Sequence, residues 1–134
     1  MKEPDAYVTG ADRPYWEGLV DGRLILPRCG SCGRWQWPAL WRCGECGSWN
    51  FKWHKVAPKG VIYSWTRTHH VFSGLEALDY PFVSAVVGLP DAGGVRLLGI
   101  LENDDPEIGM QVQGAVGKTL YAGEEFPALR WRAV

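Results

Sequence analysis

The sequence predicts a small, mainly β protein in which a short N-terminal helix precedes a metal-stapled ribbon and a five-stranded barrel. The chain has 134 residues, which is enough for one compact unit with a shared core. It contains 17 Gly and 9 Pro, a composition that favours turns and short strands over long helices. Its 4 Cys form two C-x-x-C pairs. We therefore expect an N-terminal arm and helix over residues 1–22, a ribbon over residues 23–57 and a barrel over residues 58–134.

The first element is predicted to be a helix of about two turns. Asp12 can cap it, Pro14 suits its first turn and Gly22 can end it. Its apolar residues fall at helical spacing and are Tyr15, Trp16, Leu19 and Val20. A helix this short is not stable alone, so it must pack against its own domain or a partner.

The cysteines carry the strongest signal in the chain. Two five-residue turns repeat one pattern, Cys29-Gly30-Ser31-Cys32-Gly33 and Cys43-Gly44-Glu45-Cys46-Gly47. Two residues between cysteines let both thiolates reach one metal ion, and the glycine after the second cysteine tolerates positive φ. Two such turns at the tips of adjacent hairpins predict a zinc ribbon in which Cys29, Cys32, Cys43 and Cys46 hold structural zinc.

Other uses of the cysteines are less consistent with the pattern. Disulfides are disfavoured in a reducing cytosol, and a duplicated, glycine-flanked pair is not expected of thioredoxin-like redox chemistry. A rubredoxin-like iron site has the same ligand set and stays open. Catalytic zinc is disfavoured because four thiolates leave no position for water or substrate.

The strands of the barrel are predicted from short runs of β-branched and aromatic residues bounded by turns. A short apolar strand at Leu24–Leu26 leads into the first cysteine pair. The barrel strands are expected at 61–68, 82–89, 95–101, about 111–116 and about 128–133. Residues 71–79 are expected to form either a loop or one helical turn. The barrel is expected to be antiparallel.

Charge is unevenly distributed along the chain, although the net charge is only −1. The segment from Arg23 to Arg67 carries +7, and the remainder carries −8. A basic segment suggests an anionic partner such as nucleic acid, a phosphate-bearing cofactor or an acidic protein face. Neither a signal peptide nor a run long enough to span a membrane is visible, so we expect a cytoplasmic protein.

The residues argue for binding rather than autonomous catalysis. His69 and His70 are neighbours after a strand, where adjacent side chains point to opposite faces, so they are not expected to act as one site. The ribbon interleaves tryptophan with basic residues, a pattern that suits either single-stranded nucleic acid or an adenine-and-phosphate cofactor such as coenzyme A. Two or three ribbon tryptophans are expected to fill its interior, and the others to meet a protein partner. These residues are Trp35, Trp37, Trp41, Trp49 and Trp53 with Arg34, Arg42, Lys52 and Lys55.

An ordered set of motifs resembles the DUF35 family, in which a rubredoxin-like zinc ribbon is joined to an OB-fold. The resemblance runs from about residue 12 to residue 132. Apart from the cysteine turns it rests on Tyr15-Trp16-Glu17-Gly18-Leu19, Gly22-Arg23-Leu24, Lys59-Gly60-Val61-Ile62-Tyr63-Ser64-Trp65-Thr66, Tyr80-Pro81-Phe82, Leu97-Leu98-Gly99, Ile108-Gly109-Met110-Gln111-Val112 and Phe126-Pro127-Ala128-Leu129-Arg130. Many members have Pro-Pro-Arg where this chain has Pro38-Ala39-Leu40-Trp41-Arg42, so the surface offered to a partner or ligand differs there.

The resemblance implies a non-catalytic accessory subunit of a thiolase-superfamily enzyme acting on acyl-CoA thioesters. Such a partner is a thiolase, an acyltransferase or a retro-aldolase that shortens steroid side chains, and it carries the catalytic residues. The chain would then stabilise its partner and help form the CoA channel. We expect the candidate CoA contacts to be Arg34, Arg42, Lys52, Lys55 and Lys59, with Trp65 as an aromatic platform.

Two other functions stay open at this point. A single-stranded nucleic-acid-binding protein is compatible with a ribbon and an OB-fold by fold analogy alone, although the acidic second half of the chain weakens it. An autonomous enzyme that uses the two histidines is the third possibility. We expect no membrane association.

Overall fold

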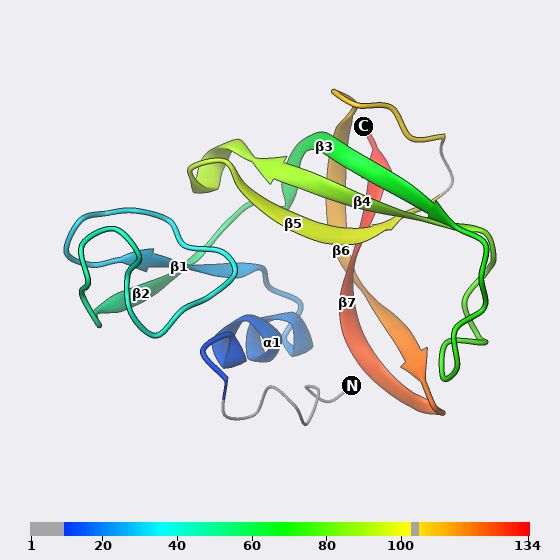
Figure 1. Ribbon diagram of the computed structural model, residues 1–134, viewed down its shortest axis with the longest axis horizontal. Coiled ribbons are helices and arrows are strands. Elements are labelled where there is room, and N and C mark those ends of the chain that lie inside the picture. Colours follow the sequence, from blue (N-terminus) through cyan, green and yellow to red (C-terminus); the bar gives the residue numbers. More distant parts are fainter. Residues whose placement is uncertain (1–9, 103–104) are drawn as a thin grey trace.

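A computed structural model describes residues 10–102 and 105–134 and has the predicted architecture (Figure 1). A short helix and a two-stranded ribbon lie beside a closed five-stranded barrel. No described helix is long and apolar enough to cross a membrane. The elements in order are α1 (Arg13–Val20), β1 (Ile25–Cys29), β2 (Phe51–Lys55), β3 (Lys59–Thr68), β4 (Phe82–Leu89), the 3₁₀ turn η2 (Pro90–Ala92), β5 (Val95–Leu101), β6 (Gln111–Tyr121) and β7 (Glu124–Ala133).

Helix α1 forms where the sequence predicts it, but Asp12 plays a different part from the one expected. Asp12 stands at the N-cap position without accepting a capping hydrogen bond from the backbone. Its carboxylate instead accepts a hydrogen bond from the indole N–H of Trp16, at 3.1 Å. Tyr15 and Leu19 are buried, and the Tyr15 ring lies 4.6 Å from the ring of Trp37 in the ribbon. The helix is therefore held by packing, as its length requires.

The ribbon consists of β1 and β2, which pair antiparallel from Ile25 opposite Lys55 to Cys29 opposite Phe51. The chain between the two strands contains the remaining three cysteines. One contact between the ribbon and the barrel is made by Trp35, which lies against the turn that follows η2. A Cβ added to Gly93, which has φ of +65°, would lie 2.8 Å from Trp35 Cδ1. Gly93 thus provides both the turn and the space that this contact needs.

The barrel has the strand order β3-β4-β5-β7-β6 and closes through a β3–β6 pairing. The expectation of a wholly antiparallel barrel is wrong at one place, because β5 and β7 pair parallel at Ile100 opposite Arg130 and Leu101 opposite Trp131. The register of these two strands covers only those two residue pairs. A Greek-key barrel of this kind is the OB-fold.

The last two strands are longer than the sequence indicates. The structure extends β6 to Tyr121 and starts β7 at Glu124, so that the two form one long hairpin. Its turn consists of Ala122 and Gly123, with φ of 49° and 83°. Such a two-residue turn needs positive φ at both positions, and alanine rarely provides it, so the sequence carries only a weak turn signal there. Residues 71–79 form turns rather than a helix.

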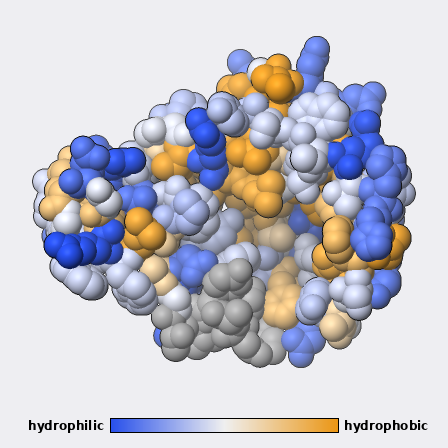
Figure 2. Space-filling model, viewed as in Figure 1, coloured by the Kyte–Doolittle hydropathy of each residue, from blue (hydrophilic) through white to orange (hydrophobic). Residues whose placement is uncertain are grey.

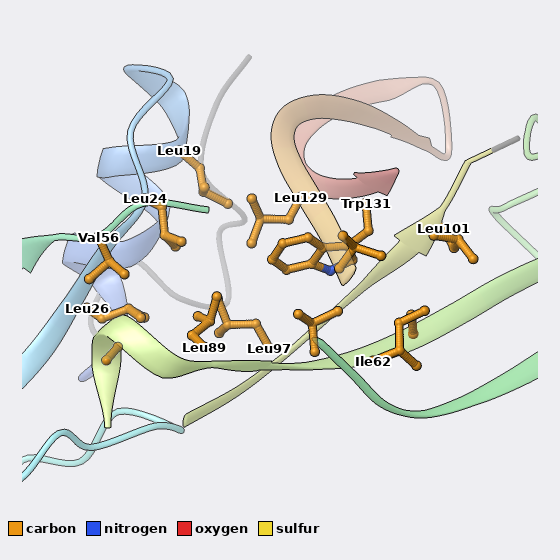
Figure 3. Close-up of a cluster of buried hydrophobic side chains, with 14 of the residues drawn as sticks. Leu19, Leu24, Leu26, Val56, Ile62, Leu89, Leu97, Leu101, Leu129 and Trp131 are labelled. Atoms are coloured by element: carbon orange, nitrogen blue, oxygen red, sulfur yellow. The ribbon is translucent and has the colours of Figure 1, made fainter. Parts of the chain in front are cut away.

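One hydrophobic core runs through the barrel and reaches the ribbon and α1 (Figure 3). The alternating burial of β4 places Val83, Ala85, Val87 and Leu89 inside. The Trp131 side chain is fully buried and occupies the barrel interior beside Leu129 and Leu97. The helix and ribbon side contributes Leu19, Leu24, Leu26 and Val56 to the same cluster.

Trp131 fits because two neighbouring strands present glycine to it. A Cβ on Gly99 in β5 would lie 2.6 Å from Trp131 Nε1, and one on Gly114 in β6 would lie 2.8 Å from Trp131 Cζ3. Real Cβ atoms do not approach other heavy atoms this closely, because repulsion rises steeply below van der Waals contact. The two glycines therefore define the space that the indole fills.

Candidate metal centre

The four cysteine sulfurs converge at the tip of the ribbon. Cys29 ends β1, and all four Sγ atoms lie within 4.8 Å of one another. The Sγ atoms of Cys29 and Cys46 are 3.5 Å apart, and those of Cys32 and Cys43 are 3.7 Å apart. A tetrahedron of thiolates at about 2.3 Å from zinc has sulfur–sulfur edges of about 3.8 Å. The donor set and its spacing therefore fit a closed, structural zinc site.

Local backbone geometry orients the thiols toward this point. Gly33 and Gly47 follow the second cysteine of each turn with φ of 80° and 77°. In each turn this glycine donates its backbone N–H to the carbonyl oxygen of the first cysteine, at 3.0 Å. Only glycine adopts such φ values without strain, which explains why both turns carry it.

Backbone N–H groups also stabilise the thiolate form of the first cysteine in each turn. The N–H of Cys32 lies 3.5 Å from Cys29 Sγ and lowers the pKa of the Cys29 thiol to about 6. The N–H groups of Cys46 and Glu45 lower the pKa of Cys43, and the Glu45 nitrogen is 3.4 Å from that sulfur. A thiolate is the form that binds metal, so these N–H groups favour metal loading near neutral pH.

Two arginines brace the turns in matching ways that the sequence reasoning missed. Arg28 donates from Nε to the carbonyl oxygen of Gly33 at 2.6 Å, and Arg42 donates from Nε to that of Gly47 at 2.8 Å. Each arginine directly precedes the first cysteine of its turn. The sequence does contain a signal for this bracing, because the repeated unit is six residues long, Arg-Cys-Gly-x-Cys-Gly. The five-residue turn considered for metal binding leaves out the arginine.

Polar contacts connect the two turns to each other. Arg34 Nη1 lies 2.6 Å from Glu45 Oε2, and the Ser31 hydroxyl lies 2.9 Å from that of Ser48. The Arg34–Glu45 pair is half exposed, so its own contribution to stability is small, about 0–1 kcal/mol. The pair matters for function because Arg34, one of the candidate CoA contacts, is already bound to Glu45.

The six candidate CoA contacts do not gather at one place. Arg34 and Arg42 are engaged within the cysteine turns. Lys52 and Lys55 lie on β2, exposed, and alternation along the strand directs them to opposite faces. Lys59 begins β3 with its Nζ 3.8 Å from Asp91 Oδ2. Trp65 lies further along β3, half-buried against the core, with the Arg67 guanidinium 5.5 Å from its ring centre.

The histidines do not form a catalytic cluster. His69 and His70 follow β3 and are exposed, and the His70 ring packs edge-on against Phe72 at 4.8 Å. Within residues 10–102 and 105–134, the four cysteines are the one group of His, Cys, Asp or Glu side chains close enough to share a metal ion. Acidic residues are also frequent between positions 102 and 107. Of these, Glu102 contacts Arg132 at 3.4 Å and Asp105 contacts Arg67 at 3.6 Å, whereas Asp104 lies outside the described residues.

A groove of about 380 Å³ lies between α1 and the ribbon. Its lining is mostly aromatic and aliphatic, with Arg13 at the α1 side. The ribbon contributes Pro27, Leu40, Trp41, Trp49, Phe51 and Trp53. Three of the five ribbon tryptophans, Trp35, Trp37 and Trp53, pack against the core, whereas Trp41 and Trp49 remain exposed.

Comparison with known families and structures agrees with this geometry. Residues 16–51 match the family described as the ChsH2 rubredoxin-like zinc ribbon domain, and residues 53–118 match the ChsH2 C-terminal OB-fold domain. A solved structure described as the Ltp2-ChsH2(DUF35) aldolase is similar over 98% of both chains, with 28% identity and a TM-score of 0.78.

A second solved structure, a DUF35 protein of unknown function from Sulfolobus solfataricus, shares the fold at 21% identity and a TM-score of 0.62. It covers 97% of this chain and 90% of that one. No curated protein matches the sequence.

Proposed function

Because this chain belongs to the DUF35 family and carries the ChsH2 zinc ribbon and OB-fold domains in that order, we propose that it is a non-catalytic subunit of a thiolase-fold aldolase acting on acyl-CoA thioesters. The observation that carries the proposal is the full-length similarity to the Ltp2-ChsH2(DUF35) aldolase. The partner subunit would supply the catalytic residues, and this chain would stabilise it and help to form the CoA channel. Steroid side chains are one class of acyl group that such an enzyme would shorten.

The closed metal centre supports an accessory role. Four thiolates would occupy every position of a tetrahedral zinc ion, leaving none for substrate or for a reactive water. When bound, zinc would supply cross-linking of the two cysteine turns. The residues of this chain orient the thiolates, brace the turns and bury Cys29 and Cys43, all of which serve folding.

The outer face of the barrel favours this proposal over the nucleic-acid alternative. OB-folds bind oligonucleotides mainly on the face of their second and third strands, which here are β4 and β5. Figure 2 shows hydrophobic residues over these strands. Their outward residues are Phe82, Ser84, Val86, Arg96, Leu98 and Ile100. Arg96 is the one cation among them, and its guanidinium lies 3.7 Å from the ring centre of Tyr63. Few groups on this face would hold phosphates.

Within this function, Lys52 or Lys55 is the strongest candidate for contact with CoA, and their opposite faces on β2 mean that a single CoA site would use one of them. Neither ammonium group forms an ion pair or hydrogen bond with any of the residues that the structure describes. Arg34, Arg42 and Lys59 already contact Glu45, Gly47 and Asp91, so their use would require those contacts to be shared.

Co-expression with the thiolase-fold proteins of the native host tests the proposal. We expect one of them to co-elute with this chain in fixed stoichiometry and to cleave a 3-hydroxyacyl-CoA by retro-aldol reaction, whereas the isolated chain is inactive. Activity of the isolated chain would instead revive the autonomous enzyme. Tight oligonucleotide binding that weakens steeply with salt, without a thiolase-fold partner, would support the nucleic-acid alternative.

A further inference from the structure

We propose that the groove between α1 and the ribbon is the surface on which the thiolase-fold subunit docks. Trp41 and Trp49 would pack against an apolar side chain of that subunit. Carboxylates of the subunit would lie around that side chain and face the basic ribbon. This inference rests on the proposed function and names the surface that performs it.

The groove has the shape and chemistry of a socket for an apolar side chain. Its floor is formed by Pro27, Phe51 and Trp53, which are held in place by the ribbon strands. Leu40, Trp41 and Trp49 line it from the chain between those strands. Its volume of about 380 Å³ accommodates one or two large side chains and is not filled by any residue that the structure describes.

Trp41 and Trp49 do not fill the hydrophobic core of the chain. Trp41 is 62% exposed and Trp49 is 71% exposed, and neither belongs to the core cluster. The other six tryptophans belong to the core or pack against it. Large aromatic residues that stay in water on a small protein commonly mark an interface, where tryptophan contributes disproportionately to binding energy.

Charge favours an acidic protein surface as the occupant. Residues 23–57 carry six basic side chains against the single acid Glu45, which already contacts Arg34. A second copy of this chain docked symmetrically through the same groove would bring two positive ribbons together, so this form of self-association is disfavoured. Free CoA fits the groove poorly, because Arg13 is the one cation in its lining and its Nε contacts Glu17 Oε1 at 2.6 Å.

The experiment compares three forms of the chain, each co-expressed with the native thiolase-fold subunit. The double variant Trp41→Ser/Trp49→Ser removes the two aromatic side chains proposed to contact the partner. The variant Leu98→Ser is the matched control. Leu98 is 65% exposed on the outer face of β5, away from the groove lining. Zinc content and melting temperature should be unchanged in both variants, because all three side chains are exposed.

We expect the double variant to weaken the complex at least about 100-fold, as loss of two central tryptophans does elsewhere, and the control to stay within about threefold. Association of the wild type should also slow as salt is raised from about 50 to 300 mM, because residues 23–57 carry six basic side chains against one acid.

Each other result would overturn the inference. If the double variant binds the partner as well as the wild type does, the groove is not the docking site, but the proposed function stands. If the wild type forms no complex, both the docking site and the proposed function are refuted. Saturable quenching of tryptophan fluorescence by free CoA that the double variant loses would assign the groove to a ligand. Dimerisation of the chain alone that the double variant loses would assign it to a second copy.

Discussion

Substitution of Gly114 by alanine tests whether the barrel is built around Trp131. The added Cβ would lie 2.8 and 3.0 Å from Cζ3 and Cε3 of that indole and 3.3 Å from Pro58 Cβ. Trp131 is fully buried, and a Cβ on Gly99 in the strand on its other side would lie 2.6 Å from its Nε1, so the indole is confined from both sides. Overpacking of this kind costs about 1–3 kcal/mol, and alanine recovers about 0.4–1 kcal/mol by restricting the unfolded chain. The net loss should be about 1–2 kcal/mol.

Another strand of the barrel, β4, provides a matched control. Gly88 in β4 is also a strand glycine, but a Cβ there would meet nothing closer than Val61 O at 3.9 Å. Gly88→Ala should therefore be neutral or slightly stabilising. For a chain of this size the net loss at Gly114 corresponds to a fall in melting temperature of roughly 4–8 °C, measured by circular dichroism on zinc-loaded protein.

A double-mutant cycle identifies the partner of the clash. In the Trp131→Phe background, which opens space in the barrel, Gly114→Ala should cost less than half of what it costs in the wild type. Equal costs in both backgrounds, or equal effects of Gly114→Ala and Gly88→Ala, would refute the packing argument.

The remaining predictions concern the metal centre and the contact between the ribbon and the barrel. Cys43→Ala should give metal-free or insoluble protein when zinc is measured by atomic absorption; full zinc content with unchanged melting would contradict a four-thiolate site. Zinc affinity should fall as pH is lowered, because protons compete with zinc for the thiolates: Cys32, whose pKa is raised to about 11, must release a proton on binding already at neutral pH, and Cys29, whose pKa is lowered to about 6, adds a second proton below that value; affinity that falls no more steeply from pH 6 to pH 5 than from pH 8 to pH 7 would contradict this. Gly93→Ala should lower the melting temperature by several degrees, because it strains a φ of +65° and presses on Trp35, while Gly94→Ala, with φ of +78° and open space, should show the strain alone. Equal effects at the two glycines would exclude the Trp35 contact.

The metal centre was predictable because its chemistry acts over short stretches of chain. Thiolate spacing and the positive-φ glycines are local properties, so Cys29 to Gly33 and Cys43 to Gly47 indicate both the turn and its ligand. The hydrogen bonds of Arg28 and Arg42 are equally local. They could not be predicted, because they depend on the direction of the Gly33 and Gly47 carbonyl oxygens in the folded turns. The strands at 61–68, 82–89 and 95–101 were predicted for the same reason: their alternation and bounding turns lie in the sequence itself.

The arrangement of distant residues was less accessible. The cations Arg34 and Lys59 and the aromatic Trp65 suggested one binding surface, yet Arg34 and Lys59 pair with acidic residues in different parts of the fold and Trp65 packs beside Arg67. The extension of β6 and β7 was missed because Ala122 at positive φ gives little signal and Pro127 resembles a strand breaker. Gly99 and Gly114 show their role only once Trp131 lies between them.

The continuity of the core across ribbon and barrel ties the fate of the whole chain to the supply of zinc in the cell. Leu24 and Leu26 lead directly along β1 to Cys29, so loosening of the cysteine turns also releases side chains that help to close the barrel. A zinc-starved cell would thus accumulate chains open to proteases over their whole length rather than intact barrels with a frayed appendage. Limited proteolysis after chelation would reveal this as the absence of any stable barrel fragment, and the abundance of the folded chain would follow zinc availability.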